Sequence, residues 1–245
     1  MIIYGGDHSM TISGLDTWEE FGLAPMAKPT FAPPKMKTKL VSIEGTSSRL
    51  DLSTVLTGYP TYENSEGTWS FLWNPEKGDW AEYYSKIMNY IHGRNHTIIL
   101  NDDPEYYREG LLTVNTYESK DHTVEIEIDY SVAPYKRKLQ TVSELYPSVF
   151  TNITVKDGST YLDIVPDFIS YLDEEPVCPT ITVNDNANIE IEYYNRNYNQ
   201  SVHRVLTAGT KQYPDIVFGT HGNNHVALKA KGTGTMSIDF RQGRL

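Results

Sequence analysis

The most constraining feature of this sequence is a strict alternation of apolar and acidic residues near its middle. The apolar members are Val124, Ile126 and Ile128, and the acidic members are Glu125, Glu127 and Asp129. Successive side chains of a β-strand point to opposite faces of a sheet, whereas helical neighbours recur every three to four residues. The segment therefore predicts a half-buried strand with one face in a core and one acidic face in water.

The composition extends this expectation to the whole chain. The 245 residues are 39% apolar and 22% charged, a normal globular mixture, and 18 of them are Tyr. Thr, Asn, Ile and Val are plentiful, while Ala-rich and Leu-rich helical stretches are nearly absent, so the bias is towards strands. The length allows one large β domain or two ordinary ones.

One segment has the periodicity of a helix, at about residues 79–92. Asp79 is a suitable N-cap, and Gly93 stands where a C-terminal glycine belongs. Apolar side chains recur between them at three- and four-residue spacing: Trp80, Tyr83, Tyr84, Ile87 and Ile91. Such a stripe on a single helix must be buried, so we expect the helix to cover a sheet face.

The second half is typical of a β-sandwich, with short strands separated by turns. The expected strands are residues 148–155, 181–183, 189–194, 202–207, 216–219, 225–230 and 235–241. The sequence Ala133-Pro134-Tyr135, followed by a basic triplet, indicates a domain end near residue 138. The predicted domains are therefore residues 1–138 and 139–245.

The segment from Ser48 to Trp73 is harder to interpret. It follows a Pro-rich stretch, Pro25 to Lys39, which favours an extended connector over regular pairing. Its middle mixes Leu and Tyr with turn-forming Gly58, Pro60 and Asn64 and has no clear period. Long structureless connections are uncommon in compact domains and often have a function.

Charge and cysteine content exclude several classes of protein. The net charge is −11, with 32 acidic and 21 basic residues, and no basic face is apparent. Nucleic-acid binders need clustered Lys and Arg, so specific nucleic-acid binding is not expected. The single cysteine, Cys178, excludes an internal disulfide, and no segment resembles a secretory signal or a membrane span. We expect a soluble chain made in the cytoplasm.

No pattern typical of an enzyme occurs, and no metal or cofactor is expected. Asp102-Asp103 could form an acid–base pair, but two carboxylates before a proline are common in turns. The sequence lacks a Gly-x-Ser-x-Gly elbow and a phosphate-binding glycine loop. A hydrolase acting on wall polymers would need an activity that is lost when Asp102 or Asp103 is changed.

Tyr193, Tyr194 and Tyr198 lie among amide and guanidinium donors in the segment IEYYNRNYNQ. Aromatic faces with such donors could contact a glycan, and protein interfaces use the same residue types. The alternative structural interpretation places one tyrosine in the core and the others on a polar rim. A carbohydrate-binding module for bacterial wall glycans is therefore the second functional hypothesis.

Several segments together resemble the distal tail protein (Dit) family of long, non-contractile-tailed bacteriophages, including siphovirus and prophage tails. They are LVSIEGTSSRLDLSTVLTGYPTYENSEGTWSF (40–71), IMNYIHGR (87–94), IILNDDPEYYREGLLTVN (98–115), VEIEIDYSVAPYKRK (124–138) and GTHGNNHVALKAKGTGTMSIDFRQGRL (219–245). They follow the order of the family, although each motif is diffuse. No inserted sugar-binding module like those of larger relatives is present.

The resemblance implies an N-terminal β domain with one helix and a long extended hairpin, the belt, joined to a C-terminal galectin-like β-sandwich. It also implies a structural virion protein that forms a homohexameric ring at the tail tip or baseplate. Such a ring, which can stack on another, joins the major tail tube protein to tail-tip and receptor-binding proteins during host attachment, and leaves a channel for DNA.

This resemblance gives the unexplained segment a role in subunit contact. We assign the belt to about residues 45–68. Apolar and aromatic side chains in an extended segment can be buried across a neighbouring copy, and the expected anchors are Leu50, Leu52, Leu56, Tyr59, Tyr62 and Trp69. The alternative is that the segment folds back on its own domain. The acidic row of Glu125, Glu127 and Asp129 is a candidate for the channel wall.

Overall fold

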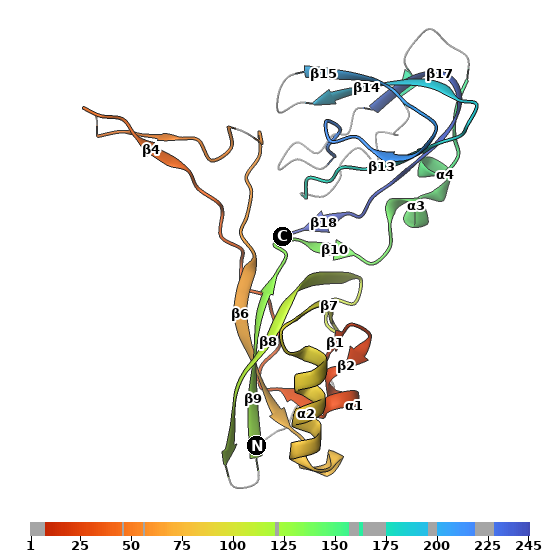
Figure 1. Cartoon of the computed structure of the whole chain (residues 1–245). Helices are drawn as coiled ribbons and strands as arrows, with labels where there is room; N and C mark the ends of the chain where they lie inside the picture. Colours follow the sequence, from red (N-terminus) through yellow and green to blue (C-terminus); the bar gives the residue numbers. More distant parts are fainter. Residues whose placement is uncertain are drawn as a thin grey trace. The chain divides into compact units, whose positions relative to one another are not determined.

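The computed structural model confirms a mainly β protein (Figure 1). It describes residues 8–45, 47–55, 57–120, 123–156, 162–163, 175–195, 200–218 and 228–245. Contacts divide the chain into two compact units. Unit 1 combines Met1–Met36 with Tyr62–Lys136, and unit 2 combines Lys37–Thr61 with Arg137–Leu245.

Unit 1 is built on an antiparallel sheet with the strand order β2-β1-β7-β8-β9-β6-β3. The strands are β1 (Met10–Ile12), β2 (Leu15–Asp16), β3 (Leu23–Pro25), β6 (Ser65–Trp73), β7 (Arg94–Leu100), β8 (Tyr106–Lys120) and β9 (Thr123–Val132). In β9 the apolar residues from Val124 to Val132 are buried and the residues between them are partly exposed. The alternation in the sequence thus corresponds to the two faces of this sheet.

Two helices contribute to the core on the apolar side of this sheet. The longer helix, α2 (Trp80–Ile91), follows the short 3-10 helix η1 (Pro75–Lys77) and buries Ile87 and Ile91 in the same core cluster as Phe71 and Ile126. Gly93, after its end, has a left-handed φ of 69°.

The other helix, α1 (Thr17–Phe21), was not predicted, since the sequence indicated one helix in this domain. It is only five residues long, and its boundaries come from caps rather than from periodicity. The Asp16 carboxylate accepts hydrogen bonds from the backbone N–H groups of Trp18 and Glu19, and Gly22 adopts the left-handed conformation at the other end.

Apart from the β4–β5 hairpin of residues 37–61, unit 2 contains a second set of strands, with the order β15-β14-β17-β13-β16. Its described elements are α3 (Val142–Leu145), α4 (Pro147–Phe150), β11 (Ile153–Val155), β12 (Leu162–Asp163), β13 (Thr180–Val183), β14 (Asn188–Asn195), β15 (Gln200–Val205), β16 (Gly209–Gln212) and β17 (Leu228–Asp239). In addition, β10 (Lys136–Lys138) pairs with β18 (Gly243–Arg244).

One long strand, β17, connects the two halves of this arrangement. Its first half pairs with β12 and β14, and its second half pairs with β11 and β13. The sequence predicted two separate strands here, at 225–230 and 235–241. They are one strand because Gly232 and Gly234, with φ of 106° and 145°, allow the backbone to bend without interruption.

Two other predicted strands are also wrong in part. Residues 148–150 belong to helix α4, and only Ile153–Val155 of the range 148–155 is extended and paired. In the range 216–219, the described residues form an isolated bridge between Val177 and Phe218 rather than a strand.

Candidate interaction surfaces

The segment Lys37–Thr61, named the arm below, is a narrow two-stranded hairpin (Figure 1). β4 (Leu40–Ser42) and β5 (Arg49–Asp51) pair antiparallel, with Val41 opposite Leu50. Two further backbone hydrogen bonds, both 2.8 Å long, join the two sides of the hairpin toward its base. They run from Leu52 N to Lys39 O and from Lys37 N to Thr61 O. All six residues of β4 and β5 are exposed.

The arm carries apolar side chains that a lone hairpin leaves in water. By strand alternation, Val41 and Ile43 share one face with Leu50 and Leu52 across the ladder. The Leu50 side chain is 49% exposed, and Val41 and Ile43 are exposed to a similar degree. Isolated two-stranded hairpins are at best marginally stable in water, so this surface needs a partner to be buried.

Three of the predicted belt anchors lie on the arm. Leu50 is exposed, and Leu52 and Tyr59 are half-buried. Leu56 lies outside the described residues. The hairpin also begins earlier than the assigned range of 45–68, because its first strand starts at Leu40 and the range ends inside β6.

The other two predicted anchors are occupied within unit 1. Tyr62 is half-buried and packs edge-to-face on Tyr135, with ring centroids 5.9 Å apart. Trp69 is 6% exposed, stacks on Tyr130 at 4.3 Å and donates its indole N–H to Thr30 O at 2.9 Å. Trp69 is therefore a core residue, and the prediction that it anchors a neighbouring copy is wrong because its ring faces its own sheet.

The sheet of unit 1 has a second, acidic surface, named the outer face. It is formed by the residues of β6, β8 and β9 that alternate with the buried ones, and its acids are Glu66, Glu109, Glu118, Glu125, Glu127 and Asp129. Hydroxyl groups support the carboxylates: Thr68 donates to Asp129 at 2.6 Å, and Ser131 donates to Glu66 at 3.2 Å. Along β6 and β9, the outward side chains described by the structure include no Lys or Arg.

On the opposite side of that sheet, aromatic rings gather where α2 begins. Trp80, Tyr83 and Tyr84 of α2 are half-buried, and Tyr117 of β8 is 45% exposed. These four residues form the aromatic patch. Tyr117 lies 4.8 Å from the Tyr84 ring and 5.3 Å from the Trp80 ring, while Trp80 packs on the buried Trp73 at 5.3 Å. The sequence predicted a buried helical stripe here and gave Tyr117 no role.

The predicted glycan contacts do not form a described binding surface. Tyr193 is 5% exposed, and its hydroxyl donates to Val217 O inside the core of unit 2. Burial raises the pKa of Tyr193 to about 12. The prediction that Tyr193 contacts a sugar is therefore wrong, because its ring packs in the core. Tyr198 lies outside the described residues, as does the side chain of Tyr194.

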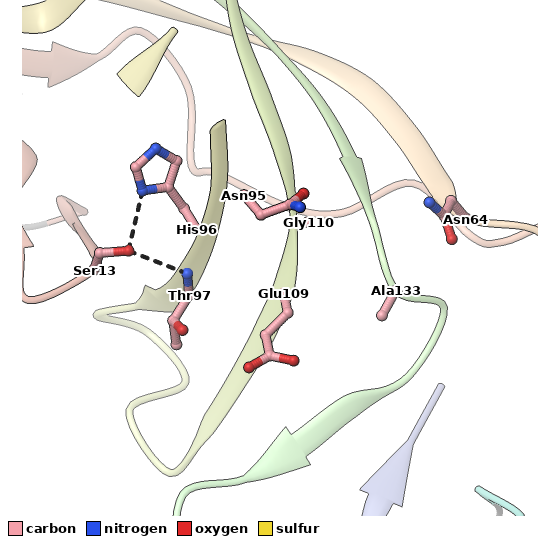
Figure 2. Close-up of a pocket in the computed structure, with 8 residues that line it drawn as sticks. All are labelled: Ser13, Asn64, Asn95, His96, Thr97, Glu109, Gly110 and Ala133. Carbon is pink, nitrogen blue, oxygen red and sulfur yellow. Dashed lines mark hydrogen bonds between the residues drawn. The ribbon is translucent and has the colours of Figure 1, made fainter. Parts of the chain in front are cut away.

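A polar depression of about 430 Å³ lies in unit 1, lined by residues that include Ser13, His96 and Glu109 (Figure 2). Ser13 Oγ lies 3.0 Å from His96 Nδ1, and His96 Nε2 lies 3.2 Å from Ile91 O. Because a carbonyl can only accept, Nε2 carries the proton and Ser13 donates to Nδ1. Burial lowers the pKa of His96, which keeps the ring neutral near neutral pH.

The Ser13–His96 pair has a structural explanation. Ser13 and Gly14 have φ of 46° and 92°, which a two-residue turn between antiparallel strands requires. Ser13 Oγ also accepts the Thr97 N–H at 3.3 Å, so the pair fastens the β1–β2 turn to β7 (Figure 2).

Other candidates for chemistry also have structural roles. Asp102 lies 3.0 Å from His8 and 3.5 Å from Lys28, and Asp103 pairs with Lys136 at 2.5 Å in the turn before β8. Burial raises the pKa of the Cys178 thiol, which makes it a poor nucleophile. Among the residues that the structure describes, no group of His, Cys, Asp and Glu could hold a metal ion. No described helix is long and apolar enough to cross a membrane.

The segment LVSIEG, Leu40 to Gly45, has a strand signal in the sequence, but the belt range of 45–68 left most of it out. The structure places its first residues in β4, the exposed first strand of the arm. A signal was present in Lys35, Lys37 and Lys39, which precede it at alternate positions and are all exposed. This spacing places three charges on the same side of an extended chain as Val41 and Ile43.

Comparisons with known proteins find a similar fold but no matching sequence family. No protein-family model and no curated protein matches this sequence. The fold is similar to that of the crystal structure of SPP1 Dit (gp 19.1), described as a paradigm of the hub adsorption apparatus in phages that infect Gram-positive bacteria. The TM-score is 0.59 at 11% identity, covering 97% of this chain and 99% of that chain.

Proposed function

We propose that this chain is a structural hub protein of a long, non-contractile phage tail. Six copies close into a ring at the distal end of the tail, and the galectin-like C-terminal sandwich of each copy completes the hub. The observation that carries the proposal is the exposed apolar arm, in a chain whose fold resembles that of a phage hub protein over nearly its whole length.

The arm supports assembly because its exposed apolar face can be buried on another copy. When two different patches of one chain meet, the contact repeats head to tail until the ring closes. Leu50, Leu52, Leu56 and Tyr59 are the anchors assigned to this contact, since buried apolar and aromatic side chains contribute most interface energy. Trp69 and Tyr62 are left out of this contact, because both pack on residues of unit 1.

The outer face is the proposed wall of a DNA channel. DNA carries a high density of negative charge, and Lys or Arg along a channel would hold it. The outward positions of β9 instead bear Glu125, Glu127 and Asp129. Such a wall repels the phosphates and lets DNA pass.

The ring joins the tail tube protein on one side to the tail-tip and receptor-binding proteins on the other. In this role the chain is a non-enzymatic component of the virion, made in the host cytoplasm. The alternative of a wall-glycan-binding module is less well supported, because Tyr193 is buried.

The first test is the mass of the purified chain by light scattering on a sizing column, with negative-stain images of the main peak. We expect a sixfold ring with a central hole, of six times the chain mass. Leu50→Asp and Leu52→Asp place a charge in the contact and should leave monomers with folded units. Val205→Asp is the matched control, because Val205 is exposed in unit 2 outside the arm. A wild-type chain that stays monomeric at every concentration contradicts the self-closing ring.

A second test addresses the channel wall. The triple change of Glu125, Glu127 and Asp129 to Lys should give the ring a salt-dependent affinity for duplex DNA, measured by fluorescence anisotropy, where wild type has none. The control carries the same change of charge at the exposed Glu63, Glu105 and Asp185, off the outer face. Equal DNA binding by both triple variants would contradict the assignment of the outer face as the channel wall.

A further inference from the structure

The polar depression of unit 1 is lined partly by side chains whose hydrogen bonds are already made within the fold (Figure 2). Both ring nitrogens of His96 are engaged, one by Ser13 and the other by a backbone carbonyl. Ser13 Oγ also accepts a backbone N–H, and Asn64 Nδ2 donates to Ser131 Oγ at 3.2 Å. The Ser13 hydroxyl and the His96 ring therefore have no donor left for a ligand.

Three other lining side chains are not used in this way. Within the part of the chain that the structure describes, the Glu109 carboxylate, the Thr97 hydroxyl and the Asn95 amide make no hydrogen bond or ion pair. Thr97 lies directly opposite Glu109 across β7 and β8, and Asn95 is on the same face two residues from Thr97. Opposite residues of a sheet have Cβ atoms about 5 Å apart and diagonal ones about 7–8 Å apart, so one small ligand can contact all three.

The free groups favour a cation that donates hydrogen bonds. Glu109 is the only acid among the described lining residues, and none of them is Lys or Arg. A phosphate or carboxylate would be repelled by this charge. A sugar would find no Trp, Tyr or Phe ring among the same residues to stack on. A metal ion would find too few ligands, since no described group of His, Cys, Asp and Glu could hold one.

An exposed leucine beside the depression adds an apolar contact. Leu111 is 41% exposed and lies two residues after Glu109 in β8, so both side chains are on the outer face. Its partners in the neighbouring strands are Asn95 and Ser131, which are polar. A ligand with methylene groups next to its charged end would cover Leu111 while its charge stays hydrated, and alkylamines have this structure.

We infer that this depression binds the primary ammonium group of an alkylamine, such as a polyamine or the side chain of a lysine. The ammonium pairs with the Glu109 carboxylate and donates to Thr97 Oγ and Asn95 Oδ1, while the methylene chain lies on Leu111. The site lies within a single chain, so it goes beyond the proposed ring and does not depend on it. Because DNA carries a condensed layer of cations, polyamines that accompany it would reach this site on the proposed channel wall.

Calorimetric titration of the purified chain with putrescine in a low-salt buffer tests the site. We expect saturable binding by the wild-type chain. Glu109→Gln should weaken the affinity by about fivefold or more, because it removes the charge and keeps the shape of the side chain. Glu127→Gln is the matched control, since it removes the same charge from the outer face away from the depression, and should weaken it by less than about twofold. Equal weakening by both variants would show binding to the overall charge of the outer face and would overturn the site.

Two comparisons of probes test the assigned contacts. Tetramethylammonium carries the charge without an N–H, so it should bind more weakly than methylammonium. Leu111→Ser should weaken the binding of putrescine by about threefold and leave that of methylammonium unchanged, because methylammonium has no methylene chain. Equal binding of the two small cations, or an equal effect of Leu111→Ser on putrescine and methylammonium, would overturn these contacts.

A lysine probe distinguishes the source of the amine. N-acetyl-lysine methylamide presents the same ammonium group on a peptide backbone. Tighter binding of putrescine supports the site with a free polyamine as its ligand, and tighter binding of the lysine probe supports it with a basic segment of a partner protein. Absence of saturable binding of either probe to the wild-type chain overturns the site.

These titrations are separate from the test of the proposed function, which is the mass of the assembled chain. A chain that forms rings but binds no amine contradicts only the ammonium site. A chain that binds putrescine through Glu109 but stays monomeric contradicts only the self-closing ring.

Discussion

Two antiparallel hairpins of this protein have similar local sequence patterns and opposite environments. In the β8–β9 hairpin, every second residue of β9 from Val124 to Val132 is buried against a core. In the arm, Val41 and Leu50 form a comparable apolar pair, yet both are exposed. The alternation sets which face is apolar, but it does not determine what covers that face.

The two hairpins differ in the process that their apolar side chains stabilise. The β8–β9 hairpin packs inside its own unit, so its buried side chains contribute to the free energy of folding. The apolar side chains of the arm contribute almost nothing to folding of the isolated chain, so the free energy of removing them from water can contribute to binding instead. Regions of this second kind are expected where a chain assembles with copies or partners.

The largest expected effect is the difference in unfolding free energy between two matched truncations, one in each hairpin. Ile126→Ala removes a fully buried side chain of β9 and should lower the free energy of unfolding of unit 1 by about 2–5 kcal/mol. Leu50→Ala in the arm should change it by less than about 0.5 kcal/mol. Urea unfolding followed by tryptophan fluorescence measures unit 1 alone, because all 4 tryptophans, Trp18, Trp69, Trp73 and Trp80, lie in it. An equal effect of both substitutions would mean that the arm packs on its own chain.

Two glycines allow the comparison to be repeated on the backbone. A Cβ at Gly110 in β8 would lie 2.2 Å from Ser131 O and 2.4 Å from Val132 Cα, so Gly110→Ala must push β8 and β9 apart. We expect a loss of about 1–3 kcal/mol in the urea unfolding of unit 1.

Gly45 at the end of the arm is the contrasting position. It has a φ of 79°, and no atom lies within 4 Å of an added Cβ. Gly45→Ala should cost about 1 kcal/mol in the local turn alone, since an alanine strains in the left-handed region. The unfolding of unit 1 should stay at the wild-type midpoint, while limited proteolysis should cut the arm faster. A shifted midpoint would show that the arm and unit 1 unfold together.

The parts of the fold that the sequence predicted are those set by local periodicity. The strand at Val124–Asp129 and the helix at Trp80–Ile91 each repeat their period for long enough to identify the element. Helix α1 is too short for a period to develop, and its caps at Asp16 and Gly22 are also common in loops. Strand β17 was divided at Gly232 and Gly234, because glycine marks both bends and ends of strands.

The candidate site was predicted less well than the fold, for a physical reason. Trp69, Tyr193 and Leu50 were all assigned to contacts, yet the first two are buried in their own units and only Leu50 is exposed. An aromatic or apolar residue stabilises a core and an interface by the same transfer from water, so residue type cannot distinguish them. Long-range packing decides between them, for example the stacking of Trp69 on Tyr130.

The smallest expected effect is a dependence of the free energy of unfolding on pH, and it is confined to unit 1. Burial, with Arg94 as a lesser cause, lowers the pKa of His96 below its ordinary value of about 6.5. Above that value His96 is neutral in both folded and unfolded states, and its full contribution to stability is present. As pH falls below it, the unfolded chain binds the proton more readily, so stability is progressively lost towards the lower pKa of the folded state. The arm from Lys37 to Thr61 contains no His, so it does not share this dependence.

The measurement is the urea midpoint of unit 1, followed by tryptophan fluorescence between about pH 7 and pH 5. His96→Gln should flatten its slope with pH relative to wild type. The control, Ser13→Ala, removes the donor to Nδ1 and should lower the midpoint at each pH while keeping the slope, because the imidazole still titrates. His8, His92 and His122 remain in every variant, so a difference in slope isolates His96. Equal slopes of the urea midpoint with pH in wild type and His96→Gln would show that burial of this ring does not disfavour its protonation. The contact that fastens the β1–β2 turn to β7 would then be as stable at about pH 5 as at about pH 7.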